Sequence, residues 1–125
     1  MKAATQQDTW DAIFGSGCTG YSWWRGVAAS FDMREDAPEG WSAVVRVDNP
    51  DGPGVLEFTV THKDLMRAAR KIASGKTEWP QYQGPGKETV REARNLVFNV
   101  DDADLDADSA DQVPQVATLG RVIYG

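Results

Sequence analysis

Two short stretches of alternating apolar and polar residues, separated by a turn-rich hexapeptide, constrain the fold of this chain most. Apolar residues occupy every second position in residues 41–47 and again in residues 56–60. That period is typical of strands with one buried face. The connection, residues 49–54, contains two prolines and two glycines, which favour a turn. The sequence therefore predicts an antiparallel hairpin, with its prolines where a missing backbone donor does no harm.

After the hairpin the periodicity becomes helical. Residues 61–64 resemble a capping box, with Asp64 in place of the usual glutamate, and apolar residues recur at helical spacing until Gly75. A second helix is predicted over 87–98 and a third after a capping box at 109–112.

The region before the hairpin is predicted to contain one helix and one strand. Asp8 or Thr9 can cap a short helix that stops at Gly15. Residues 21–31 are rich in aromatic and small side chains, and we expect most of them to form a strand.

No helix separates consecutive strands in this order, which argues against a parallel sheet. The prediction is a single α+β domain over residues 1–125. It contains a small three-stranded antiparallel meander, an N-terminal helix and three C-terminal helices packed on one face. The length of 125 residues fits one domain and is enough to bury a core without metal or disulfide bonds.

Composition excludes several classes of protein. A hydrophobic content of 41% with five tryptophans predicts a folded chain. No run approaches the ~18 apolar residues of a membrane span, and residues 1–7 lack the apolar core of a secretory signal. With a single cysteine, Cys18, no internal disulfide can form. We therefore expect a cytoplasmic protein that does not bind membranes.

The formal net charge of −6 is unevenly distributed. Residues 1–61 carry −5, residues 62–76 carry +4, and residues 99–111, here called the acidic segment, carry −6. The acid excess argues against direct binding to nucleic acid. Basic residues of the predicted 61–75 helix share one face, where they could bind an anion, pair with the acidic segment or simply be solvated. This basic stripe consists of Lys63, Arg67, Arg70 and Lys71.

Two patterns in the sequence carry chemistry in other proteins. Residues 15–20 match G-x-G-x-x-G, but a dinucleotide site needs this turn to follow a strand and open a helix, and here the predicted order is reversed. Cys18 could be a nucleophile with His62, the only histidine, as its base. Lone cysteines are commonly buried and inert, however. We predict a protein that is not an enzyme and has no cofactor.

The acidic segment resembles a calcium loop but lacks two of its essential positions. Asp102, Asp104 and Asp106 match the first three ligands of an EF-hand, whereas Ala107 replaces the glycine and Val113 replaces the bidentate glutamate. We therefore predict no metal site, and favour a solvated acidic turn that caps the last helix. The same carboxylates could also imitate nucleic-acid phosphates.

Two tryptophans are adjacent in the sequence. If Trp23 and Trp24 lie in one strand they point to opposite faces, so one enters the core and the other is exposed or covered by another element or a partner. Aromatic residues near arginine are enriched at binding hot spots, and Arg25 follows directly. Internal packing and a partner surface both fit this pair.

Three stretches together carry a resemblance: WDAIFG at 10–15, YSWWR at 21–25, and the C-terminal part from ADQV at 110–113 to VIYG at 122–125. The chain resembles small acidic uncharacterised proteins of actinobacterial phages and mobile elements. This family has no assigned activity, so no functional residue is transferred. The resemblance implies an accessory gene whose product binds a host component in the host cytoplasm.

These observations predict a non-enzymatic binding protein that inhibits or modulates a host protein of a nucleic-acid-handling or defence system. One alternative is a protein that sequesters an anionic, nucleotide-like molecule through the basic stripe and Arg25. Another is a structural phage component that forms homo-oligomers. The expected partner contacts are Trp23, Trp24, Arg25, Asp101, Asp102, Asp104, Asp106 and Asp108.

Overall fold

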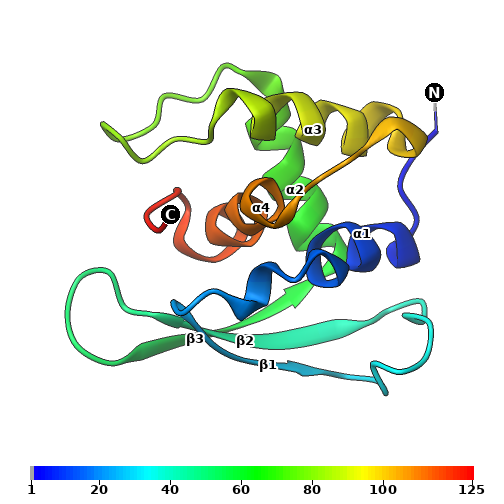
Figure 1. The fold of residues 1–125 in the computed structure, drawn as a ribbon, viewed down its shortest axis with the longest axis horizontal. Coiled ribbons are helices and arrows are strands. Elements are labelled where there is room, and N and C mark those ends of the chain that lie inside the picture. The colour runs from blue at the N-terminus through cyan, green and yellow to red at the C-terminus, as the bar shows by residue number, and fades with distance from the viewer. Residues whose placement is uncertain (1) are drawn as a thin grey trace.

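The computed structural model describes residues 2–125 and has an α+β architecture (Figure 1). The antiparallel sheet has the order β1-β2-β3, with β1 at Trp24–Ala29, β2 at Ser42–Asp48 and β3 at Val55–Thr61. The helices are α1 (Gln6–Ile13), α2 (His62–Ser74), α3 (Lys87–Phe98) and α4 (Ala107–Leu119). Short 3-10 turns lie at Phe14–Ser16, Cys18–Gly20 and Val100–Asp102.

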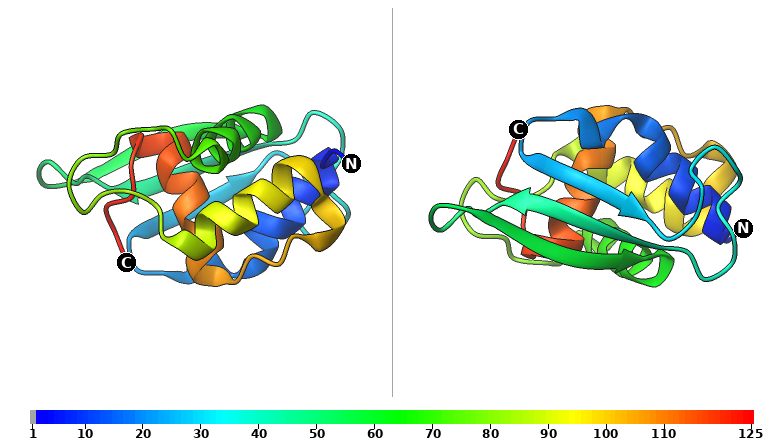
Figure 2. Two further views of the ribbon diagram at one scale, coloured as in Figure 1. Left: turned by 90° about the horizontal axis from the view of Figure 1, so that it is seen from above. Right: turned by 90° about the horizontal axis from the view of Figure 1, so that it is seen from below.

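The predicted antiparallel hairpin is confirmed. Val45 pairs with Phe58 across β2 and β3, and Val47 pairs with Leu56, so the apolar positions of both strands share one face. All four helices lie on that side of the sheet, and the other face is open to view from below (Figure 2). The predicted meander with helices on one face is therefore confirmed.

Local sequence signals set the bounds of two helices as predicted. The Thr61 side chain accepts a hydrogen bond from the Asp64 backbone, and the Asp64 carboxylate accepts one from the Thr61 backbone, which forms the capping box of α2. Gly75 ends α2 with φ 66°, a left-handed conformation that glycine adopts without strain. The α3 helix covers the predicted 87–98.

Two helix starts differ from prediction. The α1 helix is capped by Thr5, because Asp8 is the third residue of the helix and its carboxylate accepts from the Thr5 backbone. The α4 helix begins before the expected box at 109–112, because the Asp106 side chain already accepts from the Ser109 backbone. Strand β1 forms most of the predicted stretch 21–31, and residues 21–23 form a bend and turn before it.

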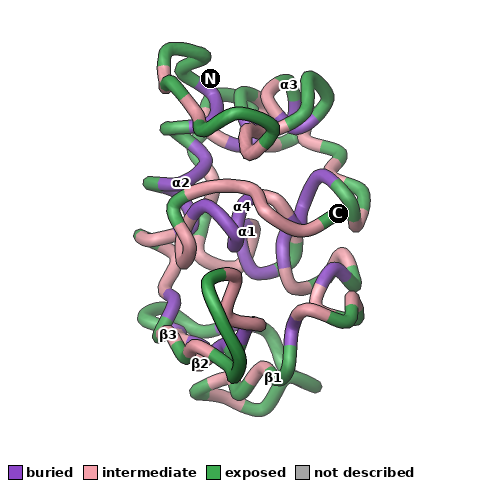
Figure 3. The backbone as a smooth tube through the Cα atoms, turned by 90° about the vertical axis from the view of Figure 1, so that its left-hand side faces the viewer, coloured by how far each residue is buried: buried purple, intermediate pink, exposed green. Residues whose placement is uncertain are grey.

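The main core lies between the sheet and the helices. Figure 3 colours the buried residues along the backbone. Val45 and Val47 from β2 lie in this core with Trp41, which immediately precedes β2, and with Ile13 from α1 and Val113 from α4. The α2 helix packs against both α3 and α4. Figure 1 shows that α3 is the helix farthest from the sheet. Among residues 2–125 no helix is long and apolar enough to span a membrane.

Candidate binding site

The adjacent tryptophans meet one buried carboxylate of α4. The Nε1–H groups of Trp23 and Trp24 both donate to Oδ1 of Asp111, the former at 3.1 Å. Trp23 precedes β1, so the strand alternation expected for the pair does not apply to it. Trp24 is 6% exposed and belongs to the core. Only Trp23 of the two is therefore available at the surface.

Asp111 is a buried acid whose hydrogen-bond donors are all neutral. The residue is 2% exposed, and its Oδ2 accepts from Gln115 Nε2 at 2.8 Å. Burial raises the pKa of Asp111 above its ordinary value, against the opposing effect of the Trp24, Trp23 and Gln115 hydrogen bonds. No basic side chain pairs with this carboxylate within residues 2–125, so its negative charge acts on its surroundings.

Trp23 is also the shared member of an aromatic stack. Tyr21 stacks on it with ring centroids 4.8 Å apart, and Tyr124 stacks on it at 5.7 Å. The segment around Tyr124 is fixed because Gln115 Oε1 accepts from the backbones of Ile123 and Tyr124. The stack therefore joins the start of β1, the α4 helix and residues 121–125 into one surface.

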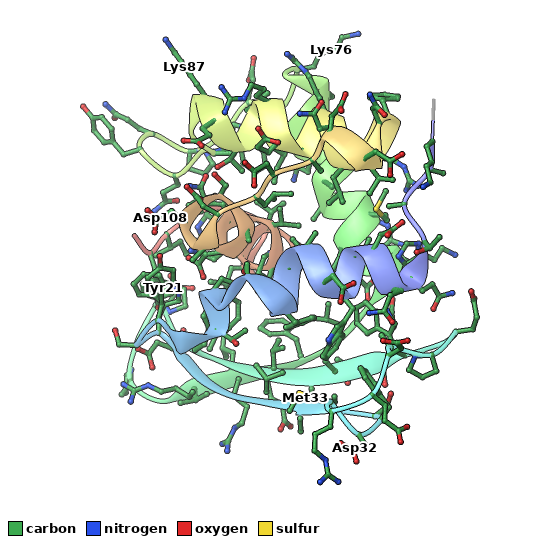
Figure 4. All side chains as sticks on the ribbon, turned by 45° about the vertical axis from the view of Figure 1, so that its right-hand side comes forward. Tyr21, Asp32, Met33, Lys76, Lys87 and Asp108 are labelled. Atoms are coloured by element: carbon green, nitrogen blue, oxygen red, sulfur yellow. The ribbon has the colours of Figure 1, made fainter. Side chains whose placement is uncertain are left out.

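A second carboxylate, Asp108, stands at the edge of this stack. It lies in the first turn of α4, where it accepts a hydrogen bond from the Tyr21 hydroxyl. Figure 4 shows the two side chains together on the same flank of the molecule. The hydrogen bond to Asp108 raises the pKa of Tyr21 to about 12, because the phenol must keep its proton to donate it.

These groups line a pocket of about 380 Å³ between α4, the segment before β1, residues 122–125 and the loop before α3. Tyr82, which stands on that loop, is 95% exposed and holds φ 63°, a left-handed conformation that is uncommon for a residue with a side chain. We call this hollow the aromatic–carboxylate pocket. Its defining residues are Tyr21, Trp23, Tyr82, Asp108, Asp111 and Tyr124.

The pocket is negatively charged. Two carboxylates line it, and none of the basic side chains in residues 2–125 does. Arg25 is engaged by Asp48 at 2.6 Å, and Arg121 by Asp51 at 3.7 Å. Lys87 follows the lining residue Gly86, but its side chain points away from Asp108 (Figure 4). The expected contact residue Arg25 thus lies near the pocket but does not line it.

The acidic segment is divided among several local roles. Asp101 pairs with Lys2 at 3.1 Å, and Asp102 accepts from Asn99. Asp106 caps α4, and the Asp104 backbone donates to the buried Glu92 carboxylate. Of the five aspartates expected to contact a partner, the structure brings only Asp108 to the aromatic–carboxylate pocket.

The basic stripe lies on the exposed face of α2, as expected. Two of its members are engaged, because Arg67 pairs with Asp64 at 3.4 Å and Lys71 lies 5.0 Å from the Trp79 ring centroid. Lys63 and Arg70 form no ion pair within the described chain. A hollow of about 170 Å³ adjoins Arg67 and Lys71.

Cys18 and His62 are held in separate hydrogen bonds. The thiol donates to the Ile13 carbonyl at 3.3 Å, and burial raises its pKa to about 11. His62 Nδ1 lies 2.7 Å from the Thr9 hydroxyl, and burial lowers the pKa of His62. The G-x-G-x-x-G segment connects α1 to β1 through two 3-10 turns and opens no helix.

Sequence reasoning missed four of the six residues that define the pocket: Tyr21, Tyr82, Asp111 and Tyr124. Periodicity did not mark Asp111, because at about 100° per residue it lies on the opposite side of α4 from Val113 and Val116; it is buried because more than one side of this helix is covered. No signal joined the tyrosines, because they come from three separate segments. Comparisons of the chain with protein-family models, with curated proteins and with solved structures found no match.

Proposed function

We propose that this protein is a non-enzymatic binding protein that engages a protein partner through the aromatic–carboxylate pocket. The observation that carries the proposal is Tyr82, an almost fully exposed aromatic side chain held by left-handed backbone at the rim of a charged hollow. Exposed tyrosines offer a large contact area with little loss of conformational entropy, and aromatic residues are enriched at interfaces. Backbone strain of this kind also concentrates at functional sites.

The class of partner follows from the resemblance of the sequence to phage and mobile-element proteins. We propose a host protein of a nucleic-acid-handling or defence system, which binding would inhibit or modulate. The pocket and the acidic segment together favour a partner with a basic surface, because complementary charge accelerates association and selects the correct partner.

Site-specific photocross-linking tests this proposal. A photoreactive phenylalanine analogue replaces Tyr82 in one variant and Met33 in a control, and each is irradiated in an extract of actinobacterial cells. Met33 is also exposed, at 59%, but lies below the sheet in Figure 4, whereas Asp108 lies above it among the helices. We expect a discrete adduct from position 82 that is lost when Asp108→Asn is added, and none from position 33. Equal labelling from both positions, or none from 82, contradicts the proposal.

The anion-binding alternative is supported by Lys63 and Arg70, which form no ion pair within residues 2–125. A thermal-shift panel of nucleotides separates the two functions, since only a small-molecule binder is stabilised by a nucleotide alone. Stabilisation that is lost in Arg70→Gln would support the alternative. A structural role predicts defined homo-oligomers on size-exclusion chromatography.

A further inference from the structure

We propose that the aromatic–carboxylate pocket recognises a guanidinium group, such as the end of an arginine side chain. This inference rests on the proposed function and specifies which chemical group the partner inserts. Three properties of the pocket support it: the charge, a free acceptor atom and the size and aromatic character of the walls.

The charge of the pocket selects a cation. Asp111 receives hydrogen bonds only from indole and amide groups, and Asp108 receives one only from the Tyr21 hydroxyl, within residues 2–125. Neutral donors stabilise a carboxylate without cancelling its charge. The arginines closest in sequence to the lining residues, Arg25 and Arg121, form ion pairs with Asp48 and Asp51. A positively charged ligand would therefore find two carboxylates with no competing cation of this chain in the pocket.

The free acceptor is on Asp108. Its Oδ1 accepts from Tyr21, whereas its Oδ2 has no hydrogen-bond partner among the described residues. The Tyr21 hydroxyl fixes the carboxylate against the stack, so Oδ2 is presented in one orientation. Both oxygens of Asp111 already accept hydrogen bonds. This buried acid would therefore attract a cation through its negative charge and not through a direct hydrogen bond.

The aromatic walls favour a guanidinium over an ammonium ion. A guanidinium is planar, more weakly hydrated than an ammonium, and can stack on an aromatic face while its edge donates to a carboxylate. Tyr82 at the rim can cover such a plane, with Asp108 at its edge. The pocket volume of about 380 Å³ is at the lower end for ligand sites, which range over ~300–1,000 Å³. One side chain, rather than a large cofactor, matches this space.

The test uses two probes of nearly the same shape. Nα-acetyl-arginine amide carries the guanidinium, and Nα-acetyl-citrulline amide replaces it with a neutral urea. Binding to the intact protein is followed by NMR, through the indole Nε1–H signal of Trp23 at the pocket and that of Trp41, which donates to the Gln6 carbonyl in the core, as an internal control. We expect the arginine probe alone to shift the Trp23 signal, with an affinity that falls as salt is added.

Two matched variants assign the effect to the pocket. Asp108→Asn removes the free acceptor, and we expect roughly tenfold weaker binding of the arginine probe, as for loss of a charge-assisted hydrogen bond. Asp104→Asn removes the same charge from an exposed residue that lies outside this pocket, and should leave affinity within about twofold, because its side chain contacts the solvent and a different hollow. The NMR spectrum of each variant reports whether it is folded.

A free guanidine compound and a partner's arginine side chain share this chemistry, so a third arm compares the arginine probe with the peptide Gly-Arg-Gly, capped at both ends. Tighter binding of the peptide indicates an arginine displayed by a protein, and equal binding indicates a free small molecule. Either result supports guanidinium recognition. Equal affinity for arginine and citrulline probes, no shift with either, or equal weakening by Asp108→Asn and Asp104→Asn overturns it.

The two proposals fail differently. If the arginine probe does not bind but position 82 still cross-links to a partner, the pocket contacts that partner by other chemistry. If the probe binds but no adduct forms, the guanidinium site holds and the proposed protein-binding function is wrong.

Discussion

Replacement of Asp111 tests whether one buried carboxylate joins the two tryptophans to the last helix. In Asp111→Ala the Trp24 indole N–H becomes a buried donor without a partner, since Trp24 is 6% exposed. An unsatisfied buried donor costs ~1–3 kcal/mol. The Trp23 indole lies at the pocket and can bond to water, and Gln115 Nε2 keeps the Tyr124 carbonyl at 3.0 Å. Because the shortened side chain also leaves a void, we expect the free energy of unfolding to fall by about 2–4 kcal/mol.

For the conservative variant Asp111→Asn we expect a smaller loss of folding stability than for Asp111→Ala. Its oxygen can still accept from both indoles, but its amide then faces Gln115 Nε2, donor to donor. Gln115 cannot rotate without cost, because its Oε1 accepts from Ile123 and Tyr124 at 2.8 and 2.9 Å. We expect a loss of about 1–2 kcal/mol.

Urea denaturation followed by circular dichroism, with thermal melting as a second measurement, tests the order wild type, Asn, Ala. For a chain of this length each kcal/mol lowers Tm by about 3–5 °C. An alanine variant as stable as the wild type, or less damaging than the asparagine variant, would refute the proposed role of Asp111 as the common acceptor.

The same carboxylate predicts a pH dependence. Its pKa is raised in the folded state, so the folded protein retains this proton where the unfolded chain has released it. The contribution of Asp111 to stability therefore increases as pH falls from above the folded pKa towards the ordinary value of 3.8, and is lost as pH rises through the folded pKa. The stability difference between wild type and Asp111→Asn should move in favour of the wild type on acidification, and the opposite trend would contradict the raised pKa.

Three further predictions test the surrounding structure. Thr61→Ala removes the cap of α2 and should cost about 1 kcal/mol in urea denaturation. Gly75→Ala should also cost about 1 kcal/mol, since φ is 66° and the added Cβ would lie 3.2 Å from an Arg94 nitrogen; Gly20→Ala, with open space around its Cβ position and no positive φ, should cost less. Cys18 should resist a thiol reagent at neutral pH until the protein unfolds, because it is buried with a pKa of about 11; labelling of the folded protein at the rate of a free thiol would contradict that burial.

Local chemistry determined most of the elements. The alternation in residues 41–47 and 56–60 was sufficient for the hairpin, and the capping box at Thr61 with Gly75 bounded α2 without tertiary information. The α1 and α4 starts were misplaced because several neighbouring polar residues could each act as a cap. The choice depends on which carboxylate reaches which backbone amide in the folded chain.

The candidate pocket was decided by tertiary structure. The sequence singled out Trp23 and Trp24, but the alternation of side chains along a strand predicted that they point to opposite faces. Because Trp23 lies in the turn before β1, both indole N–H groups reach Asp111. Tyr21 and Asp108 are 87 residues apart and meet only because α4 packs beside the segment that leads from the Cys18–Gly20 turn into β1. Periodicity and capping act over a few residues and are readable in the chain, whereas the charge and shape of a pocket depend on contacts between distant segments.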